Sequence, residues 1–259
     1  MIDFSGKKGV ILGVGNQRSI AWSVAQTLHQ LGAEIALTYL PESKGRFEAN
    51  VRELGEKINA RIICSCDMAQ DADIQQLNDT LKETWGSLDF IVHSLAFADS
   101  NDLGKPFSQT SRQGFLKAME ISAFSLLPLA SGLAPLMRET GGSIVTMSYI
   151  GAKLAVPHYN VMGPAKAALE SSVRYLAREL GPDQIRVNAI SAGAIKTLSA
   201  SGIKNFGEML KVAGEHSALN RTTRQQEVAN TTAFLCSDLA TAITGQVIYV
   251  DCGYSIMAN

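Results

Sequence analysis

The chain has little that would tie it to nucleic acid, to a membrane or to an oxidising compartment. Its 259 residues carry a formal net charge of -1, too small to attract a polyanion. No uninterrupted apolar run approaches the ~20 residues that a membrane-spanning helix needs, and the first residues lead into a strand without the apolar stretch of a secretion signal. We therefore expect a protein of the cytoplasm or of an organelle stroma, with no nucleic-acid and no membrane partner.

Cysteine and histidine are also scarce, which argues against a disulfide framework or a metal centre. Cys64 and Cys66 alternate within one strand-like run, and Cys236 and Cys252 lie far along the chain. No Cys-x-x-Cys pair and no histidine cluster completes a set of metal ligands. We expect reduced, mostly buried thiols and no metal.

What the chain does contain is a regular alternation of strand-like and helical segments. Short apolar, β-branched runs are separated by segments with helical spacing. This alternation predicts one α/β domain over residues 1–259: a Rossmann-type, doubly wound parallel sheet of about seven strands with helices on both faces. The expected strands are Lys8 to Gly13, Glu34 to Tyr39, Arg61 to Cys66, Leu88 to His93, Gly142 to Tyr149, Ile185 to Ala189 and Gln246 to Asp251. A long helical region is expected from about Thr110 to Glu139, and a helix near Gln226 to Cys236.

Several residues come directly after the ends of expected strands. Ligands of such sheets bind beyond the carboxyl ends of the strands, so these residues should line one crevice: Asp67, Ser94, Tyr149, Ile195 and Thr197. This shared position is a stronger indication of a ligand site than any one motif. For Asp67 the alternative is a capping role at the next helix.

The turn after the first strand has features of a dinucleotide-binding turn. It reads Gly13-Val-Gly-Asn-Gln-Arg-Ser-Ile-Ala and leads into a helix, so its backbone can approach a pyrophosphate at the helix N-terminus. Arg18 stands at the third glycine of the common G-x-G-x-x-G pattern, and Ser19 offers a hydroxyl at about the N-cap. Because many such junctions carry two glycines, this turn alone is a weak indication.

The end of the second strand, which selects between NADH and NADPH in such folds, has no acidic residue at its tip. Leu40 and Pro41 come after the strand, Glu42 is next, and Lys44 and Arg46 lie close behind. The two cations either accept a 2′-phosphate or belong to a solvated helix start.

The stretch from Ser148 to Glu170 carries the candidate catalytic residues. Tyr159 and Lys166 are two helical turns apart, so on a helix they share one face. A phenol beside an ammonium can act as a proton donor or oxyanion binder, because the ammonium favours the phenolate form. The same spacing fits a buried tyrosine and a lysine whose stem lies along an amphipathic helix.

Taken together, these residues resemble the short-chain dehydrogenase/reductase superfamily over the whole chain, and within it the NAD(P)H-dependent enoyl-acyl-carrier-protein reductases of bacteria and plastids. Most of the superfamily carries Tyr-x-x-x-Lys. This branch carries Tyr-x6-Lys, present here as Tyr159-Asn-Val-Met-Gly-Pro-Ala-Lys166, with Tyr149 upstream. Three further segments match the branch: Gly13 to Ala21, His93 to Ala98, and Ala192 to Leu198.

The resemblance implies a role for each matching residue. Tyr159 would bind the thioester carbonyl of the substrate, Ala98 would lie against the substrate, and Tyr149 would be an accessory catalytic residue. Lys166 would act in catalysis and hold the hydroxyls of the nicotinamide ribose. Gly13, Ser19 and Ile20 would hold the pyrophosphate, and Asp67 and Met68 would flank the adenine. Leu95 and Ala96 would lie near the ribose. The segment over the nicotinamide would contribute Ile195, Lys196, Thr197, Leu198 and Ser199.

The implied reaction is reduction of the trans-2 double bond of an enoyl chain on acyl carrier protein, a step of fatty acid elongation. NADH is the expected cofactor, and NADPH stays open because Leu40 stands where many relatives have a polar residue that contacts the ribose. A homotetramer is the expected assembly. Two other functions stay open: a ketone or alcohol oxidoreductase of the same fold, and a cofactor-sensing protein without the chemistry.

Two local features complete the expectations. Tyr149 and Lys153 imitate the Tyr-x-x-x-Lys pair of the superfamily, but Tyr149 ends a strand, and Gly151 and Pro157 interrupt any helix after it. We therefore expect Lys153 in a solvated loop, away from catalysis. Residues 195–214, rich in small side chains, are expected to form a mobile lid over the substrate.

Overall fold

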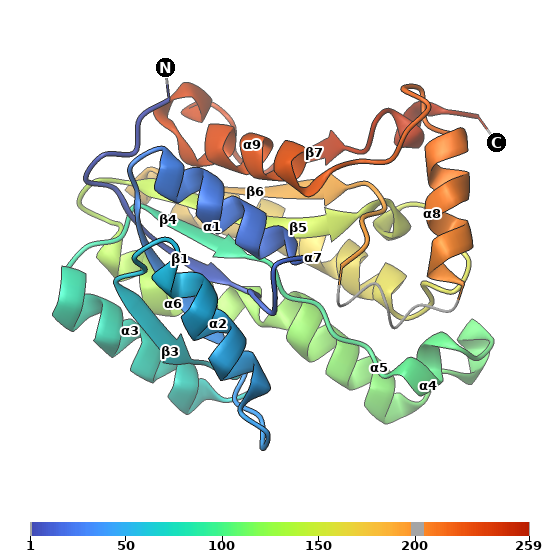
Figure 1. Ribbon diagram of the computed structural model, residues 1–259, viewed down its shortest axis with the longest axis horizontal. Coiled ribbons are helices and arrows are strands. Elements are labelled where there is room, and N and C mark those ends of the chain that lie inside the picture. Colours follow the sequence, from blue (N-terminus) through green and yellow to red (C-terminus); the bar gives the residue numbers. More distant parts are fainter. Residues whose placement is uncertain (1, 198–204, 259) are drawn as a thin grey trace.

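The computed structural model describes residues 2–197 and 205–258, and a single parallel sheet runs through the middle of them (Figure 1). Its strand order is β3-β2-β1-β4-β5-β6-β7, and every neighbouring pair is parallel. The expected doubly wound α/β fold with seven strands is confirmed. The strands are β1 (Lys8–Leu12), β2 (Glu34–Tyr39), β3 (Ile62–Ser65), β4 (Phe90–His93), β5 (Gly142–Tyr149), β6 (Ile185–Ala192) and β7 (Val247–Val250).

Strand β6 is longer than the sequence pattern predicts, because it continues through Ser191 to Ala192. These small residues resemble a loop in sequence, yet they pair with Ser148 and Tyr149 of β5 on one side and with β7 on the other. Neighbouring strands on both sides satisfy their backbone groups, and this is invisible in local periodicity. The ends of β5 and β6 therefore lie side by side at the carboxyl edge of the sheet.

Helices cover both faces of the sheet, each over its own apolar core (Figure 1). One face is covered by α1 (Ile20–Gln30), α2 (Arg46–Glu56) and α9 (Gln225–Cys236), and the other by α3 (Asp71–Trp85), α6 (Leu126–Leu133) and α7 (Met162–Leu180). The strand order reverses between β1 and β4, where the chain crosses from one half of the sheet to the other. Open sheets of this kind bind ligands at that switch point.

The long helical region expected from about Thr110 to Glu139 is present from Arg112 to Leu136, but it is irregular. It consists of α5 (Arg112–Met119), a π-helical turn η2 (Glu120–Phe124), α6 and a 3-10 turn η3 (Ala134–Leu136). The Ser125 hydroxyl donates to the Ile121 carbonyl oxygen at 2.7 Å, and the Ser125 amide donates to Glu120. A serine that bonds the preceding turn in this way perturbs a regular helix, which is why the helical region contains a π-helical turn.

The same stretch, Arg112–Leu136, is long and apolar enough, by length and composition alone, to cross a membrane. This differs from the expectation drawn from uninterrupted apolar runs. Half of its most apolar window is buried inside the fold, where α6 contributes to the core. A half-buried apolar helix is typical of the interior of an α/β protein.

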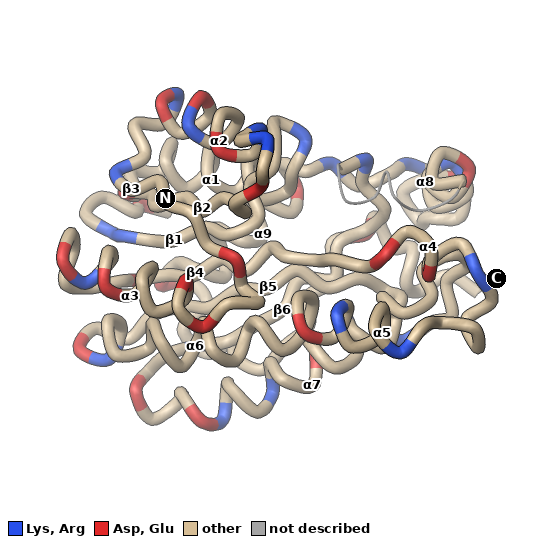
Figure 2. Tube along the Cα trace, turned by 90° about the horizontal axis from the view of Figure 1, so that it is seen from below, with Lys and Arg blue, Asp and Glu red and all other residues tan. Residues whose placement is uncertain are grey.

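Several shorter helices and helical turns complete the described part of the fold. They are α4 (Ser100–Leu103), η1 (Phe107–Gln109), η4 (Ile150–Ala152), η5 (Gly181–Asp183), α8 (Phe206–Glu215), η7 (Asp238–Ala240) and η8 (Tyr254–Ile256). Figure 1 shows α4 and α8 beyond the carboxyl ends of β5 and β6. Acidic and basic positions alternate along the outer helices (Figure 2), in keeping with the small net charge.

Candidate active site

Lys166 lies where α7 passes the ends of β4 and β5. Only 4 % of the residue is exposed, and its ammonium donates to the carbonyl oxygens of Met147 at 2.7 Å and Leu95 at 3.4 Å. Burial lowers the pKa of Lys166 to about 8, and the charge of Glu170 partly offsets this effect. The side chain therefore reaches into the strand ends and does not lie along the surface of an amphipathic helix.

Tyr159 does not share a helix with Lys166. Helix α7 begins at Met162, and Tyr159 lies in the turn before it, between His158 and Asn160. The φ angles of these two neighbours are 62° and 43°, in the left-handed region. Left-handed residues cannot continue a right-handed helix, so the expectation of one helical face for both residues is wrong.

Asn160 holds this turn in place, a role that the sequence did not suggest. Its side-chain amide donates to the carbonyl oxygens of Leu103 at 3.0 Å and Lys105 at 2.7 Å. Asparagine tolerates the left-handed conformation better than most residues. The only sequence signal was an asparagine directly after the candidate tyrosine.

The rings of Tyr149 and Tyr159 lie against each other, with centroids 4.7 Å apart and planes tilted by 58°. Glycine at position 151 leaves room for this packing, because a Cβ there would lie 2.5 Å from the Tyr159 ring. Tyr159 is 8 % exposed and belongs to a small apolar cluster beside the sheet. The structure thus brings together the two tyrosines that the sequence singled out.

Both phenols hold their protons tightly. Burial, with a smaller effect of Tyr254, raises the pKa of Tyr149 to about 12. Burial also raises the pKa of Tyr159, and Tyr149 adds to this effect. The expectation that the ammonium of Lys166 favours a phenolate is wrong here, because desolvation dominates. At neutral pH each hydroxyl is therefore protonated and can donate a hydrogen bond.

Lys153 is separated from this group, as expected. It comes after the 3-10 turn η4 and is exposed. Its ammonium lies 5.2 Å from the centroid of the Tyr249 ring on β7. Tyr149 and Lys153 therefore do not form a helical pair, and the solvated-loop prediction for Lys153 is confirmed.

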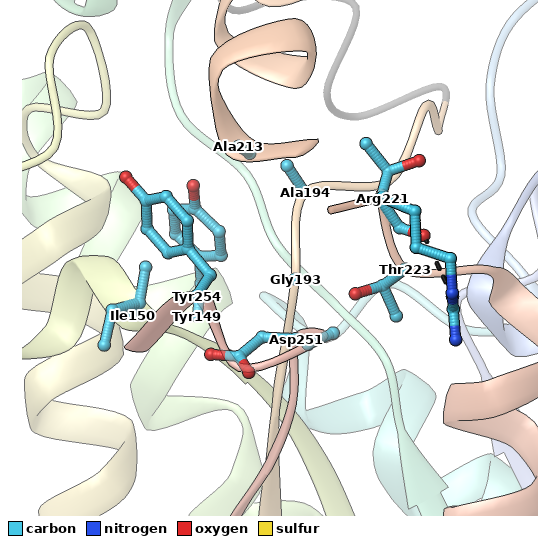
Figure 3. A pocket seen from close by; sticks show the side chains of 11 residues that line it. Tyr149, Ile150, Gly193, Ala194, Ala213, Arg221, Thr223, Asp251 and Tyr254 are labelled. Atoms are coloured by element: carbon cyan, nitrogen blue, oxygen red, sulfur yellow. Dashed lines mark hydrogen bonds between the residues drawn. The ribbon is translucent and has the colours of Figure 1, made fainter. Parts of the chain in front are cut away.

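A small cavity opens beside Tyr149 at the ends of β5, β6 and β7 (Figure 3). In Figure 3, Tyr149 and Tyr254 stand on the left, Arg221 and Thr223 on the right, Asp251 lies below, and Ala213 of α8 lies above. The lining residues are Tyr149, Ile150, Ala192, Gly193, Ala194, Ala213, Arg221, Thr222, Thr223, Asp251 and Tyr254. Helix α8, within the expected lid, thus faces the same edge as the candidate catalytic residues.

The turn between β1 and α1 has the backbone of an anion-binding cradle. Gly13 has a φ of 96°, and a Cβ there would lie 2.0 Å from the Ser94 carbonyl oxygen. Ser19 is the N-cap of α1, but its hydroxyl donates to the Asn16 carbonyl oxygen at 2.7 Å and does not cap the helix. The first turn of α1, from Ile20, has no acidic residue. These residues fit the pyrophosphate of a dinucleotide.

Asp67 and Met68 come after β3 and make contacts within the protein. Oδ1 of Asp67 accepts from the Ala69 amide at 3.0 Å, whereas the N-cap of α3 is Gln70. Asp67 therefore closes a turn, and the alternative of a helix cap is wrong. The Met68 side chain packs into the core, so it faces away from the crevice.

The segment after β4 connects Lys166 with the apolar cluster around Tyr159. The carbonyl oxygen of Leu95 accepts from Lys166, and Ala96 is exposed. Ala98 packs against the apolar cluster, whose buried members are Leu103, Ala118, Tyr159, Val161 and Met162. The candidate substrate residues Ala98 and Tyr159 thus lie on one apolar surface, which suits an acyl chain.

The segment after β6 is described only in part. Ile195 packs against the core beside α1 and α9, Lys196 is exposed, and Thr197 is half-buried. Leu198 and Ser199 lie outside the described residues, as does part of the expected lid at 195–214.

Glu42 takes part in the start of α2. Its carboxylate accepts the backbone amides of Lys44 at 3.1 Å and Phe47 at 3.2 Å, and also that of Arg46. Lys44 and Arg46 are exposed, as a solvated helix start requires, and Leu40 is exposed at the strand tip. The Glu42 carboxylate therefore lies in the same segment as Lys44 and Arg46, after the end of β2.

The cysteines and the acidic residues do not form a metal site in the described part of the chain. Among residues 2–197 and 205–258, no group of three or more His, Cys, Asp or Glu side chains is placed to hold a metal ion. All four cysteines are free, and burial raises the pKa of Cys64 to about 11 and that of Cys66 and Cys236 to about 12. Such thiols are poorly nucleophilic.

His93, the last residue of β4, forms a buried network that the sequence patterns did not indicate. Its Nδ1 and Nε2 lie 2.8 Å from the hydroxyl oxygens of Thr146 and Ser125. Burial, with the charge of Lys166, lowers the pKa of His93 to about 3, so the ring is neutral. It joins the end of β4 to β5 and to the π-helical turn.

Replacement of His93 by glutamine should change how stability depends on pH. In the wild type, the unfolded chain takes up a proton below the ordinary pKa of 6.5, whereas the folded ring does so only near 3. The wild type should therefore lose stability faster than His93→Gln as pH falls, by about 3 kcal/mol at pH 4. Denaturant unfolding at pH 7, 5.5 and 4 measures this, and parallel curves for both proteins would contradict it.

The comparisons with known proteins confirm the resemblance seen in the sequence. Residues 13–255 match the family described as enoyl-(acyl carrier protein) reductase. A protein of Nostoc sp. (strain PCC 7120) named enoyl-acyl-carrier-protein reductase (NADH) is 52% identical over 257 residues, which cover 99% of each chain. The enzyme of Anaplasma phagocytophilum, solved in complex with NAD, is 46% identical, with a TM-score of 0.94 over 99% of this chain and 96% of that one. The enzyme of Bacillus cereus, solved with NADP+ and indole naphthyridinone, is 46% identical, with a TM-score of 0.95 over 100% of both chains. The chain therefore belongs to the enoyl-acyl-carrier-protein reductase family.

Proposed function

We propose that this chain reduces the trans-2 double bond of enoyl groups carried on acyl carrier protein, with NADH as the hydride donor, in fatty acid elongation. The observation that carries the proposal is the pair of buried, protonated phenols, Tyr149 and Tyr159, which pack together at the end of β5, the strand whose Met147 carbonyl oxygen accepts from Lys166. The activity named for the relatives supports the same substrate class.

The site residues divide the chemistry between them. NADH, when bound, supplies a hydride to the β carbon of the enoyl thioester. Negative charge then develops on the thioester oxygen as an enolate, and the Tyr159 hydroxyl donates a hydrogen bond to that oxygen. A proton then adds to the α carbon, which removes the negative charge and completes the reduction. Tyr149 assists from the adjacent ring, and Lys166 holds the ribose hydroxyls. Ala98 and the apolar cluster around Tyr159 receive the acyl chain.

A spectrophotometric assay of NADH oxidation tests the proposal directly. With a crotonyl thioester the chain should turn over, and with a β-ketoacyl thioester it should not. Activity on the ketone alone would favour a ketone oxidoreductase of the same fold. Tight NADH binding without turnover of any enoyl thioester would favour a cofactor-sensing protein.

We expect NADH to be preferred over NADPH. Glu42, which comes after the end of β2, carries a negative charge, and its carboxylate already accepts the backbone amides at the start of α2. The value of kcat/KM should therefore be higher with NADH, measured with crotonyl thioester. A value at least tenfold higher with NADPH, equal to about 1.4 kcal/mol, would contradict this choice and assign a phosphate-binding role to Lys44 and Arg46.

We also propose that residues 195–214 act as a lid over the substrate within a single domain of residues 1–259. Ala213 of α8 lines the cavity next to Tyr149, so an ordered α8 would cover the reacting groups. Hydrogen exchange of this segment should slow by about tenfold or more when NAD and a substrate analogue bind together. Equal exchange with and without these ligands would remove the lid from the mechanism.

Acyl carrier protein is the proposed macromolecular partner, and a homotetramer in the cytoplasm is the proposed assembly. An open apolar groove between α5, η2 and α6 on one side and α7 on the other supports contact with a second copy. Its lining residues are Leu116, Met119, Glu120, Ala123, Phe124, Leu127, Ala168 and Ser172. Covering the exposed Leu116 and Phe124 would remove large apolar side chains from water.

A further inference from the structure

Two hydrogen bonds join helix α7 to consecutive residues at the end of β5. The Lys166 ammonium donates to the Met147 carbonyl oxygen at 2.7 Å. One helical turn later, the Glu170 carboxylate accepts from the Ser148 hydroxyl at 2.6 Å. Met147 and Ser148 are consecutive, and Tyr149 is the next residue along the strand. The helix therefore contacts the strand at two points directly before the tyrosine.

Glu170 is an unusual residue for this position. It is 5 % exposed and so is Ser148, so the carboxylate lies away from water. A buried carboxylate is costly unless a charge or a hydrogen bond compensates it. The proposed chemistry uses Tyr149, Tyr159 and Lys166 but has no role for Glu170.

The charged and titratable groups around this pair come from several elements. On α7 itself, Arg174 donates to the Glu170 carbonyl oxygen at 3.0 Å. Lys153, in the turn after η4, interacts with the charge of Glu170 and with the side chain of Tyr249 on β7, and both interactions raise the pKa of Lys153. On β4, the neutral ring of His93 lies near the charge of Lys166. Within this set, the charge of Glu170 is the one that raises the pKa of Lys166 against the effect of burial.

We propose that Glu170 is a positioning residue, which lies one turn from Lys166 on the same face of α7, pairs electrostatically with its ammonium and, through Ser148, fixes the end of β5 directly before Tyr149. The consequence for Lys166 rests on the proposed function, in which the ammonium binds the cofactor ribose. The electrostatic part can be tested without any cofactor.

Three substitutions separate charge from hydrogen bonding. Glu170→Gln keeps an acceptor for Ser148 but removes the charge, whereas Ser148→Ala removes the hydrogen bond but keeps the charge. Glu170→Asp keeps the charge on a shorter side chain. Glu179→Gln is the matched control, because Glu179 is an exposed residue of the same helix.

The first measurement is unfolding of the cofactor-free protein by denaturant between pH 7 and 9.5. Loss of the charge should lower the pKa of Lys166 further. Below the pKa of about 8 that Lys166 has in the folded protein, the attraction between Glu170 and Lys166 is fully present, and it disappears as pH rises through that value. The destabilisation caused by Glu170→Gln should therefore shrink from pH 7 to 9.5, whereas that of Ser148→Ala and Glu170→Asp should stay constant. A pH-independent effect of Glu170→Gln, or an equal pH dependence for Ser148→Ala, would overturn the proposal.

The second measurement is the dissociation constant of NADH over the same pH range, monitored by fluorescence. Affinity should fall at alkaline pH as Lys166 loses its proton, and in Glu170→Gln this fall should begin at a lower pH. Glu179→Gln should behave as the wild type does. If unfolding shows the shift but NADH binding is independent of pH in all variants, the positioning role stands and the cofactor-binding role proposed for Lys166 is refuted.

Discussion

Replacement of Lys166 by alanine should weaken NADH binding and lower turnover together, reducing kcat/KM by roughly 100-fold or more. The ammonium is the charged donor aimed at the strand ends, and each hydrogen bond from a charged group is worth about 1.5–3 kcal/mol. The buried carbonyl oxygens of Met147 and Leu95 also lose their donor. Titration with NADH and steady-state kinetics with crotonyl thioester measure the two effects separately.

Lys153 provides the matched control for this experiment. It stands in the Tyr-x-x-x-Lys pattern with Tyr149, but it is exposed after η4. Lys153→Ala should leave kcat/KM within about twofold of the wild type, as exposed substitutions away from a site usually do. If Lys153→Ala were as damaging as Lys166→Ala, the assignment of the active-site lysine would be wrong.

Replacement of Tyr159 by phenylalanine should lower kcat by about 10- to 10⁴-fold, because the hydroxyl is the proposed donor to the thioester oxygen. The raised pKa of Tyr159 keeps this donor protonated at neutral pH. The ring that packs on Tyr149 above Gly151 is retained, so the variant should fold as the wild type does. Kinetics, together with thermal unfolding, distinguish a lost hydroxyl from a lost structure.

Tyr175→Phe is the control for loss of a phenolic hydroxyl. Tyr175 is 73 % exposed on α7, in contrast to the buried pair. Its replacement should change neither kcat nor stability beyond experimental error. Unchanged turnover in Tyr159→Phe as well would refute the donor role of Tyr159 and shift attention to Tyr149.

The amino-acid sequence determined the elements of this fold and the identity of the candidate site. Buried parallel strands read as apolar runs, and helices repeat with their own period, so both patterns are visible in neighbouring residues. Gly13 and the turn to α1 were likewise recognisable from residues that are neighbours in the sequence. The sequence also excluded Lys153 from a helical pair with Tyr149, since Gly151 and Pro157 disrupt a helix locally.

Only the tertiary structure decided how these residues act on one another. Tyr159 precedes α7 because Asn160 is anchored to the segment after α4, a contact between distant parts of the chain. The protonation of the tyrosines results from burial, which spacing along the chain does not reveal. The bonds from α7 to β5 and the network of His93 likewise join segments far apart in sequence. Local periodicity records the neighbours of a residue along the chain, whereas pKa values and hydrogen bonds at this site depend on neighbours that only packing brings together.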